Sequence, residues 1–259
     1  MSAYDRRKKI LAMLNAKGRV EVKELVDIFE TSEVTIRADL RKLEHENLLK
    51  RFHGGAQTLD KAGTSVRATE NEVTLERRYG INASAKERIA QRAVSYVAPG
   101  NSVILDSGST THLIAQALAP QGAIIAITNN LPAADALAES PDTTLVICGG
   151  VYRSKTKSLH GPKAEQCLEG VSADILFIGA DGIDPQKGIT TFNTGYAISA
   201  VMAECAHKII AVVDSTKIGR VGFNKVLSTH VIDILITDSD ITAEYMEAFQ
   251  KQGVEVVMV

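Results

Sequence analysis

Seven short apolar runs lie between residues 102 and 259, and amphipathic stretches separate them. In chain order the runs are SVILD, AIIAIT, TLVICGG, DILFIGAD, KIIAVVD, ILITD and VEVVMV, and the stretches include 110–118, 131–139, 162–170, 196–206 and 242–252. Apolar strands that alternate with helices favour a parallel sheet covered on both faces. We therefore predict a Rossmann-like α/β domain, in which ligands lie beyond the carboxyl ends of the strands. A helix over 85–97 precedes the first strand.

Residues 1–58 follow a different pattern. The spacing of their apolar residues predicts helices over 5–16 and 21–30, and Ser32 is a good N-cap for a third helix that runs to about residue 46. The third helix has one apolar face, formed by Ile36, Leu40 and Leu43. LLKRF and AQTL then predict two strands around a glycine turn. Three helices and such a wing make a winged helix-turn-helix.

The third helix and the wing are rich in Arg and Lys, which suits a helix placed in the major groove of DNA. Candidate contacts at the helix start are Ser32, Glu33, Thr35, Arg37 and Ala38, of which the last four are placed to approach base edges. Candidate phosphate contacts are Arg41, Lys42, Lys50, Arg51 and His53. Phosphate would repel Asp39, so we expect Asp39 to pair with and orient a nearby arginine. The alternative is a winged helix that contacts only protein.

Charge and cysteine content fit this division. Residues 1–53 hold twelve Lys and Arg against nine Asp and Glu, a net +3, whereas the remaining 17 and 22 give −5. A mildly basic front on an acidic body is expected of a DNA-reading head on a sensor or an enzyme. Three scattered cysteines without a CxxC spacing indicate neither a disulfide framework nor a zinc site. With no secretory signal and no apolar run of roughly 20 residues, we expect a cytoplasmic protein.

The segment SEVTIRADLRKLEHENLLKRFHGGA, residues 32–56, resembles the signature of the DeoR family of bacterial transcriptional regulators. The resemblance extends through nearly the whole chain and implies a DNA-binding domain over 1–58, a linker over 59–76 and an effector-binding domain over 77–259. Ala38 stands where many members carry a second arginine, which implies a different operator preference. TIRADL with RFHGGA hints at the galactitol/tagatose-phosphate branch.

The run ILDSGSTTHL predicts a strand, a hydroxyl-rich loop and the start of a helix. Backbone N–H groups and hydroxyls at a helix N-terminus form a prepared anion site. Its members are Asp106, Ser107, Gly108, Ser109, Thr110 and Thr111. The loop lacks the lysine of a Walker motif and the three glycines of a dinucleotide fingerprint, so a phosphate on a small molecule fits better than ATP or NAD. The alternative is a helix cap without a ligand.

Polar groups follow the other predicted strands. They are Thr128, Asn129, Gly149, Gly150, Arg153, Ser158, Gly161, Asp181, Gly182, Asn193 and Lys217. Carboxylates, amides and hydroxyls hydrogen-bond sugar hydroxyls, and a lysine adds a positive charge for phosphate. Any one of these residues alone could be a turn or a cap. Together they predict an effector site.

The body of such regulators is similar to the sugar-phosphate isomerases, notably ribose-5-phosphate isomerase. SGST (107–110), GADGID (179–184) and DSTK (214–217) resemble strand ends of those enzymes. The enzymes carry a catalytic Lys and Glu soon after the Asp-rich turn, but here Thr190, Thr191 and Asn193 stand near that position and the first glutamate is Glu204. An isomerase needs a positioned base. The sequence therefore predicts binding without turnover.

The sequence as a whole predicts a DNA-binding transcriptional regulator, and we expect it to repress a carbohydrate or polyol catabolism operon. Its expected partners are double-stranded operator DNA, a phosphorylated sugar or polyol that relieves repression, and further copies of itself in a homodimer or homotetramer. We expect no membrane contact, no cofactor and no metal. One alternative is an active sugar-phosphate isomerase or deaminase with a DNA-binding appendage. Another is a scaffold that binds only protein.

Overall fold

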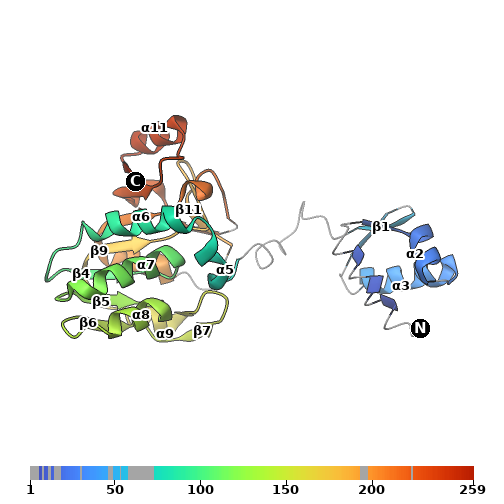
Figure 1. The fold of residues 1–259 in the computed structure, drawn as a ribbon, viewed down its shortest axis with the longest axis horizontal. Helices are drawn as coiled ribbons and strands as arrows, with labels where there is room; N and C mark the ends of the chain where they lie inside the picture. The colour runs from blue at the N-terminus through green and yellow to red at the C-terminus, as the bar shows by residue number, and fades with distance from the viewer. Residues whose placement is uncertain are drawn as a thin grey trace. The chain divides into compact units, whose positions relative to one another are not determined.

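The computed structural model describes residues 6–7, 9–10, 13–14, 19–29, 31–45, 49–52, 54–57, 73–192, 198–222 and 224–259. The chain divides into two compact units, residues 1–66 and 67–259 (Figure 1). Most of the expected linker, 59–76, falls on residues outside the described part. Of its described residues, Leu75 and Glu76 belong to a helix, and the domain boundaries stay predictions.

The N-terminal unit is the predicted winged helix. Its described residues between 6 and 14 are helical, and they are followed by β1 (Arg19–Glu21), α2 (Val22–Phe29), α3 (Glu33–His45), β2 (Lys50–Phe52) and β3 (Gly55–Gln57). The strands β2 and β3 pair antiparallel and form the wing. The sequence analysis missed β1, which pairs antiparallel with β3 and holds a single apolar residue, Val20. Three residues are too short a run to reveal a strand period.

Asp39 lies on the buried side of α3. Its carboxylate accepts hydrogen bonds from Arg6 Nε at 2.5 Å and from Arg7 Nη1 at 3.2 Å, and its side chain is 5% exposed. The expected pairing with arginine is therefore present, but both partners lie on the first helix. Asp39 joins two helices of the unit and does not orient an arginine on the exposed side of α3.

The C-terminal unit is built on a seven-stranded sheet whose neighbours are all parallel. The strand order is β15-β14-β12-β9-β4-β5-β6. The bounds are β4 (Ser102–Leu105), β5 (Ile125–Thr128), β6 (Thr144–Ile147), β9 (Ala173–Ile178), β12 (Ala206–Val212), β14 (Ile234–Thr237) and β15 (Glu255–Met258). Each strand comes from one of the seven predicted runs. The Rossmann-like parallel sheet is confirmed.

The helices of this unit are α5 (Leu75–Gly80), α6 (Ala83–Val94), α7 (Ser109–Leu118), α8 (Leu131–Ala138), α9 (Pro162–Gln166), α10 (Ile198–Glu204) and α11 (Ala243–Lys251). Helix α6 ends three residues before the predicted end at 97. The Ser95 hydroxyl donates to the Arg92 carbonyl at 2.7 Å and closes the last turn. Helix α5 was not predicted, because six residues are too few to show helical spacing.

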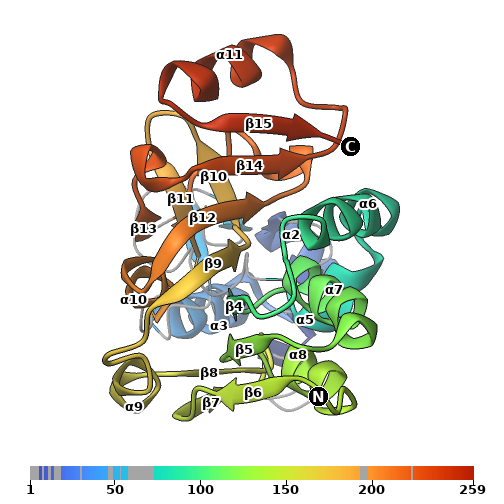
Figure 2. The same ribbon diagram turned by 90° about the vertical axis from the view of Figure 1, so that its left-hand side faces the viewer.

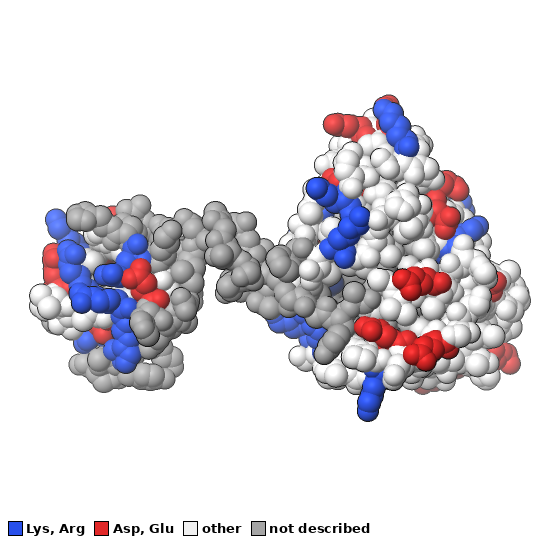
Figure 3. All heavy atoms as spheres, turned by 180° about the vertical axis from the view of Figure 1, so that it is seen from behind, with Lys and Arg blue, Asp and Glu red and all other residues white. Residues whose placement is uncertain are grey.

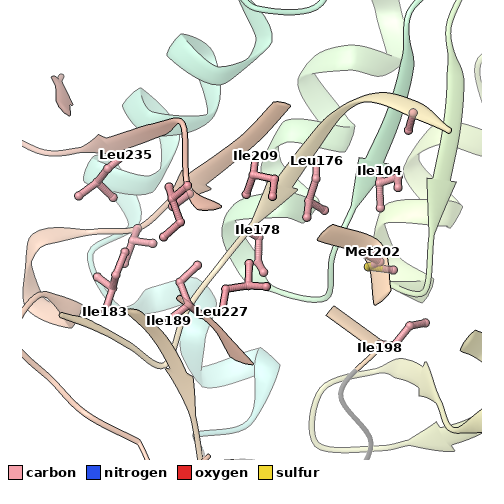
Figure 4. Packing of buried hydrophobic residues seen from close by; sticks show 14 of the residues in the cluster. Ile104, Leu176, Ile178, Ile183, Ile189, Ile198, Met202, Ile209, Leu227 and Leu235 are labelled. Atoms are coloured by element: carbon pink, nitrogen blue, oxygen red, sulfur yellow. The ribbon is translucent and has the colours of Figure 1, made fainter. Parts of the chain in front are cut away.

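Side chains of the central strands alternate between two cores, as the pleat of a strand requires. Val103, Leu105 and Phe177 pack with α6, α7 and α8, which Figure 2 shows together on one side of the sheet. Ile104 and Leu176 belong to the other core, together with Ile198 and Met202 of α10 (Figure 4). This core also includes residues of α9 and α11. The unit is therefore a three-layer sandwich with helices on both faces.

Short antiparallel elements complete the unit. β7 (Val151–Arg153) pairs with β8 (Ser158–His160), and β10 (Gly182–Asp184), β11 (Gly188–Thr191) and β13 (Asn224–Leu227) form a three-stranded sheet. Gly188 has φ +78°, and a Cβ there would lie 1.9 Å from the Leu227 carbonyl oxygen, so only glycine fits. These five strands were not predicted, because they lack the apolar runs that mark the strands of the central sheet.

The order in which strands are added to the sheet reverses beside β4. After β4 the chain builds β5 and β6 on one side, then crosses to β9 on the other side and continues outward through β12, β14 and β15. The connections therefore leave β4 and β9 in opposite directions, and a crevice opens beyond the carboxyl ends of these two strands. The fold itself thus points to the loops at residues 106–109 and 179–181.

We expect Asp39→Asn to weaken the N-terminal unit, because Arg6 and Arg7 lose a charged acceptor. The cost should be about 2 kcal/mol, between that of an exposed pair and that of a fully buried one. Hydrogen exchange of the α3 amides, followed by mass spectrometry, should accelerate roughly 30-fold. Glu33→Gln removes one charge from the half-exposed side of the same helix and should change exchange less than threefold. Equal effects of the two variants would contradict the role of Asp39.

Candidate functional site

Helix α3 of the N-terminal unit separates its residues into two sides. Its buried residues are Ile36, Asp39, Leu40 and Leu43. Its exposed residues are Glu33, Val34, Arg37, Ala38, Arg41 and Lys42. Figure 3 shows Lys and Arg side chains gathered on one face of this unit. The exposed side of α3 can therefore enter a groove of DNA with cations on either side of the base-facing residues.

Two arginines of the predicted DNA interface have intramolecular partners. Arg37 Nη2 lies 3.2 Å from Glu33 Oε2, one turn earlier on α3, and both side chains are about half exposed. Arg51 donates from Nε to Glu44 Oε2 at 2.7 Å and from its backbone N–H to Oε1 at 3.0 Å. These hydrogen bonds lower the pKa of Glu44. Both pairs fix the arginine side chains before DNA arrives.

The other predicted contacts lie at the start of α3 or in the wing. Ser32 caps the helix, since its Oγ accepts from the Thr35 N–H at 3.2 Å. Thr35 is half-buried, and its Oγ1 lies 2.9 Å from Ser32 Oγ. Lys50 lies on β2 next to Arg51. The side chain of Lys50 and the whole of His53 fall outside the described residues.

A cavity of about 450 Å³ lies at the switch point of the C-terminal unit. Residues that follow β4, β9 and β12 line it together with residues of α5, α6 and α10. Among the predicted effector residues, the lining contains Asp106, Ser107, Gly108, Ser109, Thr110, Thr111, Arg153, Asp181 and Lys217. The tertiary structure therefore brings nine predicted residues to one concave site.

Asp106 follows β4 and is 4% exposed. Its Oδ2 accepts from the Ser199 hydroxyl at 2.7 Å, and its Oδ1 accepts from the Ser107 N–H at 2.7 Å. Burial raises the pKa of Asp106 to about 6, and the nearby charge of Asp181 adds to this effect. The two hydrogen bonds oppose it. Asp106 therefore changes its charge near neutral pH.

Asp181 follows β9 on the other side of the switch point. Its Oδ1 lies 3.0 Å from Arg78 Nη2 on α5. Its Oδ2 accepts from the Thr191 hydroxyl at 2.8 Å and from the Phe192 N–H at 3.1 Å. This carboxylate therefore joins helix α5 to the small sheet at the mouth of the cavity.

Two of the three described lysines that line the cavity, Lys86 and Lys217, are at least half-buried. Lys86 on α6 is 4% exposed, and its ammonium donates to the carbonyls of Arg78 and Ile81, both at 2.6 Å. Lys217 is half-buried, and within the described part of the chain its ammonium has no hydrogen-bond or ion-pair partner. Burial lowers the pKa of both side chains. The negative charge of Asp214 opposes this lowering in both cases.

Hydrogen bonds from Asn130 and Thr111 fix the loop before α7. Asn130 Nδ2 and Thr111 Oγ1 both donate to the Gly108 carbonyl at 3.1 Å. The helix that follows has ten residues, and Ser109 and Thr110 in its first turn line the cavity. The N-terminal end of α7, with its free N–H groups and partial positive charge, therefore faces the cavity in a fixed position.

Two predicted residues at the carboxyl end of β5, Thr128 and Asn129, do not line the cavity. Thr128 is fully buried, donates to the Leu105 carbonyl at 2.6 Å and accepts from the Asn130 N–H. Asn129 donates from Nδ2 to the Leu159 carbonyl at 3.0 Å. Both side chains thus join neighbouring segments behind the loop of α7. The sequence placed them at a strand end but did not show that β5 lies one strand away from the switch point.

The remaining predicted residues also lie outside the lining. Ser158 is buried on β8 with its Oγ 2.7 Å from His160 Nε2, and Gly161 precedes α9. A Cβ on Gly150 would lie 2.5 Å from the His160 carbonyl oxygen, and one on Gly182 would lie 2.3 Å from that of Arg220, so both glycines permit close backbone packing. Gly149 follows β6 in an exposed turn. Asn193 falls outside the described residues.

Several polar lining residues were not predicted from the sequence, among them Arg78, Lys86 and Ser199. A signal for Lys86 exists, because it occupies the apolar stripe of α6 together with Ile89 and Ala93, at i, i+3 and i+7. A charged residue in such a stripe needs a buried partner. Arg78 and Ser199 carry no comparable local signal.

The described residues contain no group of three or more His, Cys, Asp or Glu side chains placed to hold a metal ion. The helices among them are all too short or too polar to cross a membrane.

Comparisons with known proteins agree with the two units. The family described as "DeoR C terminal sensor domain" matches residues 81–239, and "DeoR-like helix-turn-helix domain" matches residues 6–62. The chain is 38% identical to a "Putative aga operon transcriptional repressor" of Escherichia coli O157:H7, over 98% of this chain and 93% of that protein. It is 35% identical to "HTH-type transcriptional regulator GlpR" of Haloferax volcanii, over 99% of this chain and 98% of that protein.

Among solved structures, ribose 5-phosphate isomerase A from Methanocaldococcus jannaschii is 22% identical, with a TM-score of 0.39 over 53% of this chain and 55% of that one. The matches to both units and the full-length relatives settle the family. This chain belongs to the DeoR family of DNA-binding transcriptional regulators.

Proposed function

We propose that this chain represses a carbohydrate or polyol catabolism operon, and that a phosphorylated sugar or polyol in the 450 Å³ cavity releases it from DNA. The winged helix binds operator DNA. A homodimer or homotetramer supplies the two heads that a symmetric operator requires. Such a regulator acts in the cytoplasm, on the chromosome.

The observation that carries the proposal is the composition of the cavity. Two carboxylates, Asp106 and Asp181, lie at the switch point, and a helix N-terminus, Lys86 and Lys217 line the same space. Carboxylates accept hydrogen bonds from sugar hydroxyls, whereas lysines and free N–H groups suit a phosphate. A volume of about 450 Å³ lies in the usual range for small-molecule sites.

The phosphate is best accommodated between the start of α7 and Lys86 and Lys217. An ammonium group has three donors, and Lys86 uses two of them on backbone carbonyls, which leaves one for a ligand. Lys217 contributes its whole ammonium group. The hydroxyl groups then face Asp106 and Asp181, which gives the ligand a fixed direction in the cavity.

Occupancy reaches the DNA-binding unit through α5, the first described helix after residues 58–72. Arg78 joins α5 to Asp181, the Leu75 N–H donates to the Lys155 carbonyl at 2.8 Å, and Glu76 lies 2.9 Å from the Lys157 ammonium. A ligand hydroxyl that binds Asp181 competes with Arg78 for the carboxylate. It therefore favours a different position of α5 and of the chain that precedes it.

The names of relatives support a carbohydrate operon and vary in the compound. They include the aga operon repressor, a "Lactose phosphotransferase system repressor" of Lactococcus lactis and a "Glycerol-3-phosphate regulon repressor" of Escherichia coli. A panel of probes should therefore include glycerol 3-phosphate beside galactitol 1-phosphate and tagatose 6-phosphate.

The cavity binds its ligand without turnover in this proposal. Its described carboxylates are Asp106, Asp181 and Asp214, and each accepts hydrogen bonds or pairs with a cation. A second candidate function, an active isomerase, is favoured by one observation, which is the pKa of about 6 at Asp106, because a general base works best near the operating pH. Steady turnover of a sugar phosphate that is lost in Asp106→Asn would establish the enzyme instead.

The first test is thermal unfolding of the full chain with the three phosphorylated probes. The matching unphosphorylated compounds and inorganic phosphate serve as controls. A true effector at 100 times its Kd stabilises by about 2.7 kcal/mol, which raises Tm by roughly 5–10 °C. Lys217→Ala should abolish this rise and the release of DNA, whereas Lys208→Ala, an exposed lysine on β12, should not. Normal release by Lys217→Ala would contradict the site.

The charge of Asp106 should make stability depend on pH. Its pKa is raised from 3.8 to about 6 in the folded chain, so its contribution is fully present below pH 3.8 and is lost as the pH rises through 6. Between pH 5 and 8 the loss is on the order of 1 kcal/mol. Asp106→Asn removes this dependence.

The Tm of Asp106→Asn should therefore gain roughly 2–4 °C on that of the wild type between pH 5 and 8, measured by calorimetry. The exposed Asp142→Asn should follow the wild type throughout. A constant gap between Asp106→Asn and the wild type would show that Asp106 is ionised over the whole range.

Arg78→Gln tests the path to DNA. The variant keeps a polar side chain but loses the charge that holds Asp181, so it should bind the effector within a few-fold of the wild type. The change in operator affinity on adding effector, measured by fluorescence anisotropy, should fall toward one. Glu76→Gln on the same helix should retain most of that change, since its ion pair is exposed. Full coupling in Arg78→Gln would exclude the proposed path.

A further inference from the structure

The exposed side of α3 carries an apolar residue at its centre. Val34 is 77% exposed, the highest value among the exposed large hydrophobic residues of the described chain. At 100° per residue, it lies about 170° from the centre of the buried stripe formed by Ile36, Asp39, Leu40 and Leu43. Val34 therefore lies on the line of the helix that projects farthest from the core.

The neighbours of Val34 are of two kinds. Ala38 follows one turn later on the same line and is also exposed, so the two side chains form a small apolar row. Exposed cations lie beside this row, namely Arg37, Arg41 and Lys42. Arg37 Nη2 lies 3.2 Å from Glu33 Oε2. The row is thus a narrow apolar strip on a basic helix face.

The charges around the strip determine what can cover it. Cations on both sides complement the phosphates of a duplex, but an apolar side chain gains nothing from phosphate. On the base edges in the major groove, the 5-methyl group of thymine is the apolar group that distinguishes one base from another. A residue near the N-terminus of a recognition helix is the one that reaches those edges.

We infer that Val34, with Ala38 beside it, contacts the 5-methyl groups of thymines in the operator and makes these bases part of its specificity. The inference rests on DNA binding by α3. Val34 and Ala38 are four residues apart, a rise of about 6 Å along the helix, which corresponds to one or two base steps at 3.4 Å. The recognised thymines therefore lie within one or two steps of each other in each half-site.

The experiment begins by selecting bound duplexes from a random pool with the full-length protein. Each thymine of the selected half-site is then replaced by deoxyuridine, which removes only the methyl group, and Kd is measured by fluorescence anisotropy. One or two positions should lose about fourfold in affinity with the wild type, the value of one buried methyl group. Val34→Ala should lose a similar factor on the thymine duplex and become insensitive to deoxyuridine at one of those positions.

Three further variants separate the outcomes. Val34→Thr keeps the shape and one methyl group and should fall between the wild type and Val34→Ala. Ile28→Ala, a half-exposed apolar residue on α2, should leave affinity unchanged. Arg37→Ala should weaken binding while sensitivity to deoxyuridine at the Val34 position remains.

The inference fails if Val34→Ala keeps the wild-type affinity and the wild-type response to deoxyuridine. It also fails if Val34→Ala changes the oligomeric state in size-exclusion chromatography while DNA affinity stays the same, because the strip would then contact protein. If the wild type selects no duplex at all, the proposed function itself is wrong.

Discussion

Two carboxylates at the switch point, Asp106 and Asp181, determine which elements of the C-terminal unit meet around the cavity. Asp106 and Asp181 follow adjacent strands, β4 and β9, and burial together with the charge of Asp181 raises the pKa of Asp106. Asp106 accepts hydrogen bonds from the Ser199 hydroxyl and a backbone N–H. Asp181 pairs with Arg78 and accepts a hydrogen bond from Thr191. These partners come from α5, α10 and the small sheet. The carboxylates thereby gather three separate elements around one cavity.

In the function proposed above, the same arrangement lets the binding site transmit its occupancy. Arg78 is a partner of a cavity carboxylate and at the same time part of α5, the first described helix after residues 58–72. In that proposal, a ligand hydroxyl competes with the guanidinium for the carboxylate and so changes the position of the helix. The proposed coupling needs no long pathway, because one side chain belongs to both the cavity and the helix.

The N-terminal unit uses its charges differently. Asp39 is buried and joins the first helix to α3, whereas Glu33 and Glu44 are half-exposed and hold Arg37 and Arg51 in place. The described residues of this unit place ten apolar side chains in its buried core, and the buried pair of Asp39 adds to that small core. Because these three acids are paired with arginines, the exposed side of α3 presents arginine, lysine and the strip of Val34 and Ala38.

Local pattern was enough for much of this protein. The seven runs of the parallel sheet, the winged helix and the loop of residues 106–111 all follow from the spacing of apolar residues and from the residue types at strand ends. Those features depend on neighbours in the chain. Thr128 and Asn129 were also correctly placed at the carboxyl end of a strand, but local pattern does not say which strands are adjacent.

The order of the strands decided the rest. It made β4 and β9 neighbours and left β5 one position away, so Asp106 and Asp181 line the cavity while Thr128 supports it from behind. Lys86 reaches the cavity because α6 packs across the sheet. Arg78 reaches it because the six-residue helix α5 packs where Arg78 can pair with Asp181, about a hundred residues away in the chain. The sequence by itself determined the strands of the central sheet, the winged helix and the family. Only the tertiary structure determined which charges meet, because charge pairing depends on distance in space and not on separation along the chain.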